Sequence, residues 1–269
     1  IVAVSDYAST AASNNITIEP NGSEKINAVN DGYIMSIAGL AVTLVYADAA
    51  RGWKSVTGSD ADATGEAPAY VAATGGTPCA GATSGDYKIH SFTGPGTLCV
   101  SNAGNISGNN KIDYLVVGAG GSSGGYYGGG GAGGFRESVP SPAAWTASPL
   151  ASSGGGLTAT VSGYPIVVGG GGPAASPGTV NGNSGSLSSF STISSAGGGF
   201  GTGQPSGPAA GSGGSGGGEG YQDAGGAGSG NTPSTSPPQG NDGGEGIPAG
   251  GAGGGGGGAT TAGGNATAP

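Results

Sequence analysis

The chain has 269 residues, of which 67 are glycine and 17 are proline, and it carries a formal net charge of −9 with only 8% charged residues. Such a glycine and proline content is typical of low-complexity segments, whereas the low charge density is unlike that of soluble disordered tails. Lys and Arg together number only 6, and none follows Arg136, so we exclude nucleic acid as a partner. No apolar run approaches the roughly 20 residues that cross a bilayer, so we expect no membrane insertion.

Residues 1–57 are typical of a small β module. Apolar and polar residues alternate over 15–19, β-rich runs follow at 33–37 and 42–46, and a Pro-Asn-Gly turn separates the first two. A unit of this size buries little core, so we expect it to need a neighbour or symmetry-related copies. A polar linker is predicted for 58–84.

Short strands give way to glycine clusters between residues 85 and 196. Residues 86–92, a Thr-Gly-Pro-Gly turn and residues 97–100 predict a β-hairpin, and 112–117 has the clearest pattern of a buried strand. No window shows helical spacing with caps. The expected fold class is therefore all-β, with small antiparallel β modules followed by a glycine-rich domain of short strands and stacked polyglycine-II helices. The further β-like pieces lie at 157–161, 164–168 and 189–193.

The last part, 197–269, has almost no side chains with which to build a core. Its large apolar residues are only Phe200, Tyr221 and Ile247. Glycine lets backbones approach closely, so polyglycine-II helices, which have no internal hydrogen bonds, can bond to one another. We therefore predict a rigid tip of stacked polyglycine-II helices joined by polar loops. A flexible Gly/Ser linker is the alternative, but the regular alternation of glycine clusters with loops favours the stack.

No catalytic or cofactor motif is complete. The glycines after 116–117 resemble a dinucleotide-binding turn, but Ser123 stands where the motif needs its last glycine, and no helix follows. His90 is the only histidine, which excludes a catalytic triad and a histidine-rich metal site. We expect no enzyme activity, no cofactor and no metal ion.

Two features stay open at this point. Cys79 and Cys99 are either bridged or free. Four loop carboxylates either collect a cation or are simply solvated: Glu219, Asp223, Asp242 and Glu245.

Aromatic side chains on glycine-rich loops are typical of recognition surfaces, because they contribute contact area at a low cost in conformational entropy. Gap filling against the β block is the alternative, and we favour it for Phe135 and Trp145. Together with two polar neighbours, the other loop aromatics are our candidates for contact with a receptor: Tyr126, Tyr127, Phe200, Tyr221, Gln222 and Asp223.

Several motifs resemble those of tailed-phage fibre proteins, especially those of marine and cyanobacterial phages. Residues 15–27 and the Gly52-Trp53 pair look like the small β module of such fibres. Polyglycine-II tip adhesins of T-even-like phages are similar in architecture. The runs that resemble the glycine-rich domain of these fibres are 85–97, 113–121, 128–136, 164–172 and 236–244.

The resemblance implies a non-enzymatic virion protein, a tail fibre or adhesin subunit that recognises the host cell surface. It implies a homotrimer that attaches to other tail or fibre proteins through 1–57, and a tip at 197–269 that meets a bacterial surface glycan or an outer-membrane protein. Its location would be an external appendage of the virion, and extracellular after release. A capsid fibre or decoration protein is the first alternative. An extracellular glycine-rich structural or ice-binding protein is the second, against which the lack of a regular triplet repeat counts.

Overall fold

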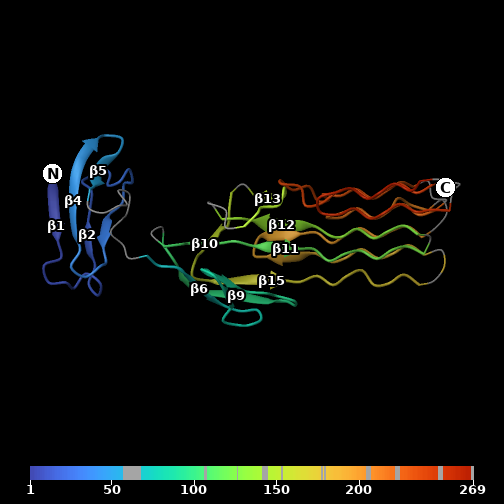
Figure 1. The fold of residues 1–269 in the computed structure, drawn as a ribbon, viewed down its shortest axis with the longest axis horizontal. Helices are drawn as coiled ribbons and strands as arrows, with labels where there is room; N and C mark the ends of the chain where they lie inside the picture. Colours follow the sequence, from blue (N-terminus) through green and yellow to red (C-terminus); the bar gives the residue numbers. More distant parts are fainter. Residues whose placement is uncertain are drawn as a thin grey trace. The chain divides into compact units, whose positions relative to one another are not determined.

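A computed structural model describes the chain except for residues 57–67, 106–107, 126, 141–144, 153, 177, 179, 204–206, 222–224, 248–250 and 268–269. All regular elements of this described part are β-strands, and none of it forms a helix that could cross a membrane. The chain divides into two compact units, the N-terminal unit (Ile1–Val71 and Ala103–Asn110) and the glycine-rich unit (Ala72–Asn102 and Lys111–Pro269) (Figure 1). The prediction of an all-β protein with a glycine-rich domain is confirmed.

The N-terminal unit contains two small antiparallel sheets and one apolar core. In β4 alternate side chains point inward, so that Val42 and Leu44 are buried, and Met35 of β3 is fully covered. Together with Ile26 and Tyr33 these side chains form the core. The sheets have the strand orders β1-β4-β5 and β2-β3. Their strands are β1 (Val2–Ser5), β2 (Ile16–Ile18), β3 (Tyr33–Met35), β4 (Ala41–Asp48) and β5 (Gly52–Ser55).

The hairpin predicted around the turn at 93–96 is wrong. β8 (Tyr87–Ile89) pairs instead with β7 (Ala82–Ser84). Only two residues separate these strands, and the first, Gly85, has a positive φ of 55°, which is typical of tight hairpin turns. The stretch 58–84, for which a linker is predicted, therefore contains a strand of this hairpin.

The glycine-rich unit has a five-stranded sheet, of order β17-β16-β15-β9-β6, and smaller sheets beside it. The predicted strand at 112–117 is two strands, because β10 pairs with β14 whereas β11 pairs with β12. Within β11 only Val116 is buried, since an antiparallel strand presents alternate side chains to solvent. The strands not yet given are β6 (Val71–Thr74), β9 (Gly96–Ala103), β10 (Lys111–Ile112), β11 (Leu115–Val117), β12 (Phe135–Ser138), β13 (Ala151–Ser152), β14 (Leu157–Thr158), β15 (Gly163–Val167), β16 (Ser188–Phe190) and β17 (Ile193–Ser195).

The two cysteines lie in the glycine-rich unit and are not bridged. Cys79 lies in the loop between β6 and β7, and Cys99 lies in β9; both are exposed. Of the two alternatives open from the sequence, the structure has the free thiols.

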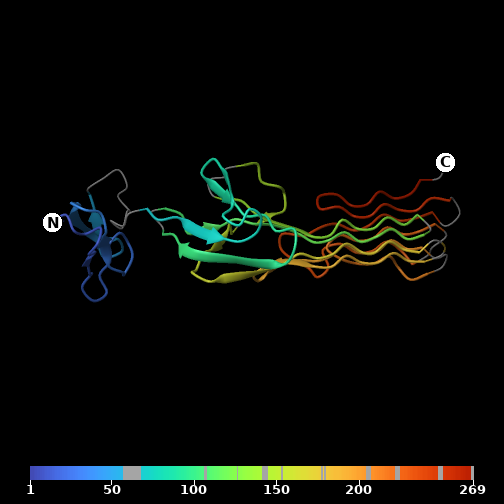
Figure 2. The same cartoon turned by 90° about the horizontal axis from the view of Figure 1, so that it is seen from below.

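Beyond the sheets, the chain passes back and forth through extended segments that form no strand ladder (Figures 1 and 2). β11, β15 and β17 each run into such a segment, and β12 and β16 each follow one. We call the stack of these segments the glycine-rich bundle. Its segments are 118–125, 128–134, 169–176, 180–187, 196–203, 207–213, 214–220, 225–231, 239–247, 252–258 and 261–267.

Segment 214–220, which we call the central helix, has the hydrogen bonds of a polyglycine-II helix. The amides of Gly216 and Glu219, three residues apart, donate to the same neighbour, 239–247. The amides of the two residues between them donate to two other segments. The carbonyls of the central helix follow the same period: carbonyls three residues apart accept from the same neighbour, and three further segments are bonded in this way. Three residues per turn is the geometry of this helix type. The central helix is thus bonded to 128–134, 196–203, 207–213, 225–231, 239–247 and 252–258.

The central helix is glycine-rich because neighbouring backbones occupy the space that side chains would need. A Cβ at Gly217 would collide with the carbonyl oxygen of Phe200, and a Cβ at Gly218 would collide with that of Gly254. Residues 213–220 are all buried, although this run contains no large apolar side chain. The core of the bundle is therefore hydrogen-bonded backbone.

Candidate functional site: the distal end of the glycine-rich bundle

The bundle segments terminate at a common end on the side away from the sheets (Figures 1 and 2). Hydrogen bonds join segment ends there: Gly125 N donates to Val180 O at 3.0 Å, and Gly203 N donates to Asn181 Oδ1 at 2.9 Å. We call this end the distal surface. Its described residues include Tyr127, Gly178, Val180, Tyr221, Gly225, Ile247 and Gly251.

Tyr127 is displayed on the distal surface with 70% of its side chain exposed. Its φ is 68°, a region that non-glycine residues seldom adopt, and a hydrogen bond of 3.0 Å from Gly124 N to Gly128 O closes the turn around it. Backbone held in such a region is concentrated at functional sites. The turn therefore fixes the backbone position from which an exposed aromatic side chain projects.

The other receptor-contact candidates are placed differently. Phe200 lies inside segment 196–203 and is half-buried, and a Cβ at Gly211 would come within 2.5 Å of its Cδ1. Its ring thus packs over a neighbouring segment rather than on the distal surface. Tyr221 is half-buried at the start of the connection that follows the central helix. The remaining candidates, Tyr126, Gln222 and Asp223, lie outside the described residues.

A hollow of about 430 Å³ opens next to Tyr127's turn. It is lined by small residues of two segments, 122–125 in one and Ala174, Ala175, Ser176 and Gly178 in the other. The Ser122 hydroxyl fixes one wall, because it donates to Pro173 O at 2.7 Å and accepts from Asn183 N at 2.8 Å. With glycine, alanine and serine as its lining, this hollow offers mainly backbone and hydroxyl groups to a ligand.

Glu219 places a carboxylate inside the bundle, two residues before Tyr221. Its Oε1 accepts from Gly226 N and its Oε2 accepts from Gly246 N, both at 2.9 Å. Burial raises the pKa of this carboxyl group, and the neighbouring carboxylate of Glu245 raises it further. The side chain therefore links three segments, 214–220, 225–231 and 239–247, close to the distal surface.

Of the two alternatives open for the loop carboxylates, solvation does not apply to Glu219, whose side chain is 5% exposed. In the described part of the chain, no group of three or more acidic, histidine or cysteine side chains could hold a metal ion. Two buried hydroxyls supply similar links. Thr202 Oγ1 accepts from Gly220 N at 2.6 Å, and Ser215 Oγ donates to Gly133 O at 2.9 Å.

A comparison with known protein families identifies a domain in the region that contains the bundle. A family model described as Glycine-rich domain matches residues 93–269. The chain belongs to the glycine-rich domain family. Neither the curated proteins nor the solved structures contain a match to the chain. The glycine-rich domain thus includes every bundle segment and the whole distal surface.

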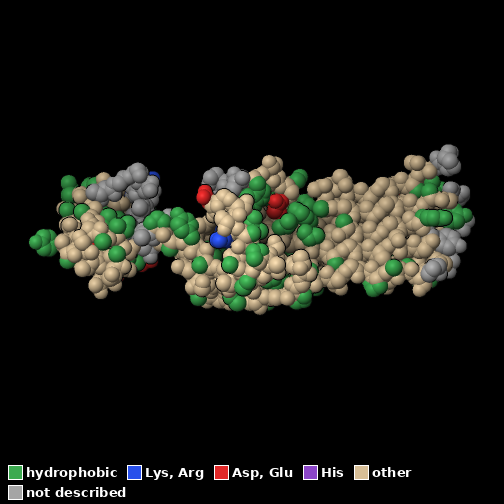
Figure 3. Space-filling view, turned by 60° about the horizontal axis from the view of Figure 1, so that its bottom comes forward, with side chains coloured by type: hydrophobic (Ala, Val, Ile, Leu, Met, Phe, Trp, Pro, Cys, Tyr) green, Lys and Arg blue, Asp and Glu red, His purple; other side chains and the backbone are tan. Residues whose placement is uncertain are grey.

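The glycine-rich domain presents a nearly uncharged surface. In the face shown in Figure 3 the bundle is covered mainly by backbone and uncharged polar side chains. The domain has no Lys or Arg after Arg136, and Glu245 and Asp242 are exposed acidic groups on the bundle. A partner would therefore meet hydrogen-bonding groups and an exposed aromatic ring, rather than a basic patch.

Proposed function

We propose that this chain is a subunit of a tailed-phage fibre that attaches the virion to its host cell, with the distal surface in contact with the receptor. The observation that carries the proposal is that exposed Tyr127 stands at the end of a bundle whose central helix is bonded to neighbours on all sides. A preordered surface loses little conformational entropy on binding. The receptor we propose is a bacterial surface glycan or an outer-membrane protein, and no catalytic step is involved.

The N-terminal unit is the proposed site of attachment and trimerisation. It exposes several large apolar side chains, and such surfaces are typical of protein interfaces. We therefore propose a homotrimer that contacts other tail or fibre proteins through this unit, on an external appendage of the virion. The exposed large apolar residues described in this unit are Ile1, Val2, Tyr7, Val29, Ile37, Tyr46, Val56 and Tyr70.

The place of the chain on the virion is tested by labelling. An antibody raised against the full chain is bound to intact virions and located by electron microscopy. Label on tail appendages supports the fibre assignment. Label on the capsid identifies a capsid fibre or decoration protein instead, and overturns the tail assignment.

The receptor contact is tested by competition. Purified full chain, added to host cells before the phage, is expected to slow adsorption in proportion to its concentration. Tyr127→Asn removes the ring while keeping a residue that tolerates positive φ, so this variant should compete several-fold less well. Val161→Asn is the matched control, since Val161 is 67% exposed and lies in the glycine-rich unit outside the distal surface, and it should compete as the wild type does. An adsorption rate that the folded wild-type chain leaves unchanged would overturn the proposal.

A further inference from the structure

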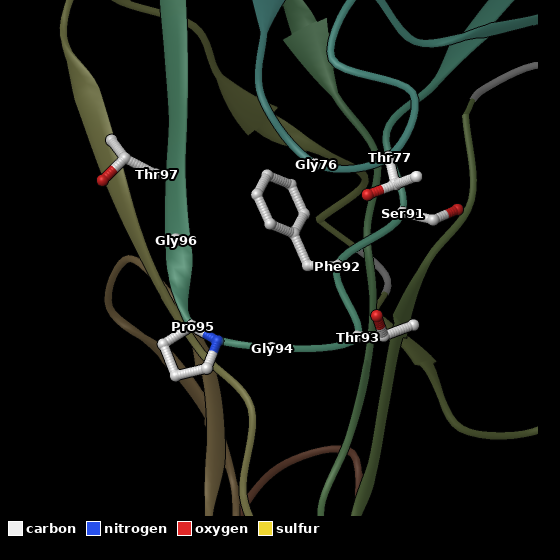
Figure 4. A pocket seen from close by; sticks show the side chains of 9 residues that line it. All are labelled: Gly76, Thr77, Ser91, Phe92, Thr93, Gly94, Pro95, Gly96 and Thr97. Atoms are coloured by element: carbon white, nitrogen blue, oxygen red, sulfur yellow. The ribbon is translucent and has the colours of Figure 1, made fainter.

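A hollow separate from the distal surface opens beside the loop that connects β8 and β9 (Figure 4). Its volume is about 270 Å³, and all of its lining residues lie between 76 and 97 of the glycine-rich unit. Sites for drug-sized ligands have volumes of about 300–1,000 Å³. This hollow is therefore of the size that accommodates a single ring.

Phe92 gives the hollow an aromatic wall. Figure 4 shows its ring between the strand that carries Gly96 and the loop that carries Gly76. A Cβ at either glycine would lie only 3.2 Å from a ring atom, so the lack of side chains at both positions lets the half-buried ring lie between the two backbones. The face of an aromatic ring carries partial negative charge and attracts the partially positive hydrogens of C–H groups. An apolar C–H face of a ligand can therefore stack on Phe92.

Four side chains that line the hollow carry a hydroxyl group, and none of the lining side chains is charged. Each hydroxyl can both donate and accept a hydrogen bond. A charged ligand would lose hydration without gaining a counter-charge here, so the lining favours a neutral one. The hydroxyls belong to Thr77, Ser91, Thr93 and Thr97.

The walls of the hollow are held by hydrogen bonds within the protein. Thr77 N donates to Ser91 O at 2.8 Å, which ties the two loops together. His90 Nδ1 lies 2.8 Å from Gly75 O, in hydrogen-bond contact, and secures the same loop. Because these contacts preform the site, a ligand meets little ordering cost.

We propose that this hollow binds a neutral hexopyranose, whose C–H face stacks on Phe92 and whose hydroxyls bond to Thr77 and Thr93. A pyranose ring combines an apolar C–H face with a rim of hydroxyl groups, which matches a lining that offers one aromatic ring and uncharged hydroxyl groups. The proposal does not rest on the attachment function, because the hollow shares no residue with the distal surface.

Saturation-transfer NMR with the full chain tests the site, using the methyl glycosides of glucose, galactose and mannose as probes. A ligand of this size that binds with ordinary efficiency has a dissociation constant on the order of 1 mM. We expect saturation transfer to at least one of the three. A proline-rich peptide is included as a second probe, since such peptides also dock on aromatic surfaces.

Gly94→Leu is the decisive variant, because Gly94 lines the hollow and a Cβ there meets nothing within 4 Å, so a leucine adds bulk at the hollow without strain. It should weaken glycoside binding at least tenfold. Gly170→Leu is the matched control: a Cβ at Gly170 is equally unobstructed, and this variant should bind as the wild type does. Phe92→Leu, which keeps an apolar side chain but removes the ring, should also weaken binding.

Four results would overturn the sugar site. They are the absence of transfer to all three glycosides by the folded wild type, unchanged binding by Gly94→Leu, equal loss in Gly170→Leu, and binding of the peptide alone. None of them bears on the adsorption experiment, so a failure of this site and a failure of the attachment function are distinguishable.

Discussion

The carboxylate of Glu219 accepts a hydrogen bond from the backbone amide of Gly246, with 2.9 Å between Oε2 and the amide nitrogen. The amide of Gly226 donates to the other carboxylate oxygen. These bonds favour the ionised group, whereas burial and the adjacent Glu245 favour the protonated one, and burial has the largest effect. The pKa of Glu219 is therefore raised, and the stability of the bundle depends on pH.

We expect the glycine-rich unit to lose stability as pH rises above the ordinary carboxyl pKa of 4.5. The folded chain holds the Glu219 proton above the ordinary pKa of 4.5. The resulting stabilisation is complete below that value and is lost as pH rises through the folded pKa. Glu245→Gln removes a carboxylate that raises this pKa, so the loss should be smaller in the variant. Calorimetry across this range measures it, and identical pH profiles for variant and wild type would contradict the prediction.

Asp6 gives the stability of the N-terminal unit the opposite dependence on pH. Amide hydrogen bonds, led by that of Ala11 and joined by those of Gly39 and Thr10, hold the pKa of its carboxyl group below 3.8. The stabilisation is present above 3.8 and is lost as pH falls through the lowered folded pKa. Asp6→Asn should therefore destabilise this unit at neutral pH and reduce its acid sensitivity. An unfolding transition of the N-terminal unit that the substitution leaves unchanged at every pH would refute this.

Gly217→Ala tests close backbone packing in the central helix. The added Cβ would collide with the carbonyl of Phe200, so we expect a loss of about 3 kcal/mol or more in unfolding free energy. Gly264→Ala is the matched control, because a Cβ there meets nothing within 4 Å; its effect should stay within about 0.5 kcal/mol. Denaturant titration followed by circular dichroism measures both. Equal effects of the two substitutions would show that the bundle is not packed as described.

Gln239→Ala tests a polar anchor at the end of the bundle near the sheets. The side chain is 1% exposed, its Oε1 accepts from Ala196 N at 2.8 Å, and its Nε2 donates to Pro233 O at 2.7 Å. Alanine would leave the amide of Ala196 without this acceptor, at a cost of about 1–3 kcal/mol. The same denaturant titration reports it, and a variant as stable as the wild type would be inconsistent with this role.

Sequence patterns predict those strands in which alternate apolar side chains are buried in a core. Alternation identifies β4, because Val42 and Leu44 fill the core of the N-terminal unit. The same reasoning fails around residues 93–96. The β7–β8 hairpin depends on the backbone conformation of Gly85, and the small side chains of β7 give no alternating pattern.

Only part of the candidate site is predictable from sequence. Tyr127 lies on the distal surface as an exposed loop aromatic, whereas Phe200, chosen on the same reasoning, packs over Gly211. The burial of Glu219 cannot be inferred from the sequence, because it results from backbones of segments distant in the chain. Glycine has no side chain whose pattern would reveal which cluster becomes the central helix.

Amide hydrogen exchange of the full chain tests most directly whether backbone hydrogen bonds hold the glycine-rich bundle together. The amides of Gly216, Gly217 and Gly218 donate to three different segments. We expect them to exchange only through unfolding of the whole unit, and so to be among its slowest. Exchange of these three amides at the rates of an unstructured glycine-rich peptide would contradict the bundle, and with it the rigid distal surface.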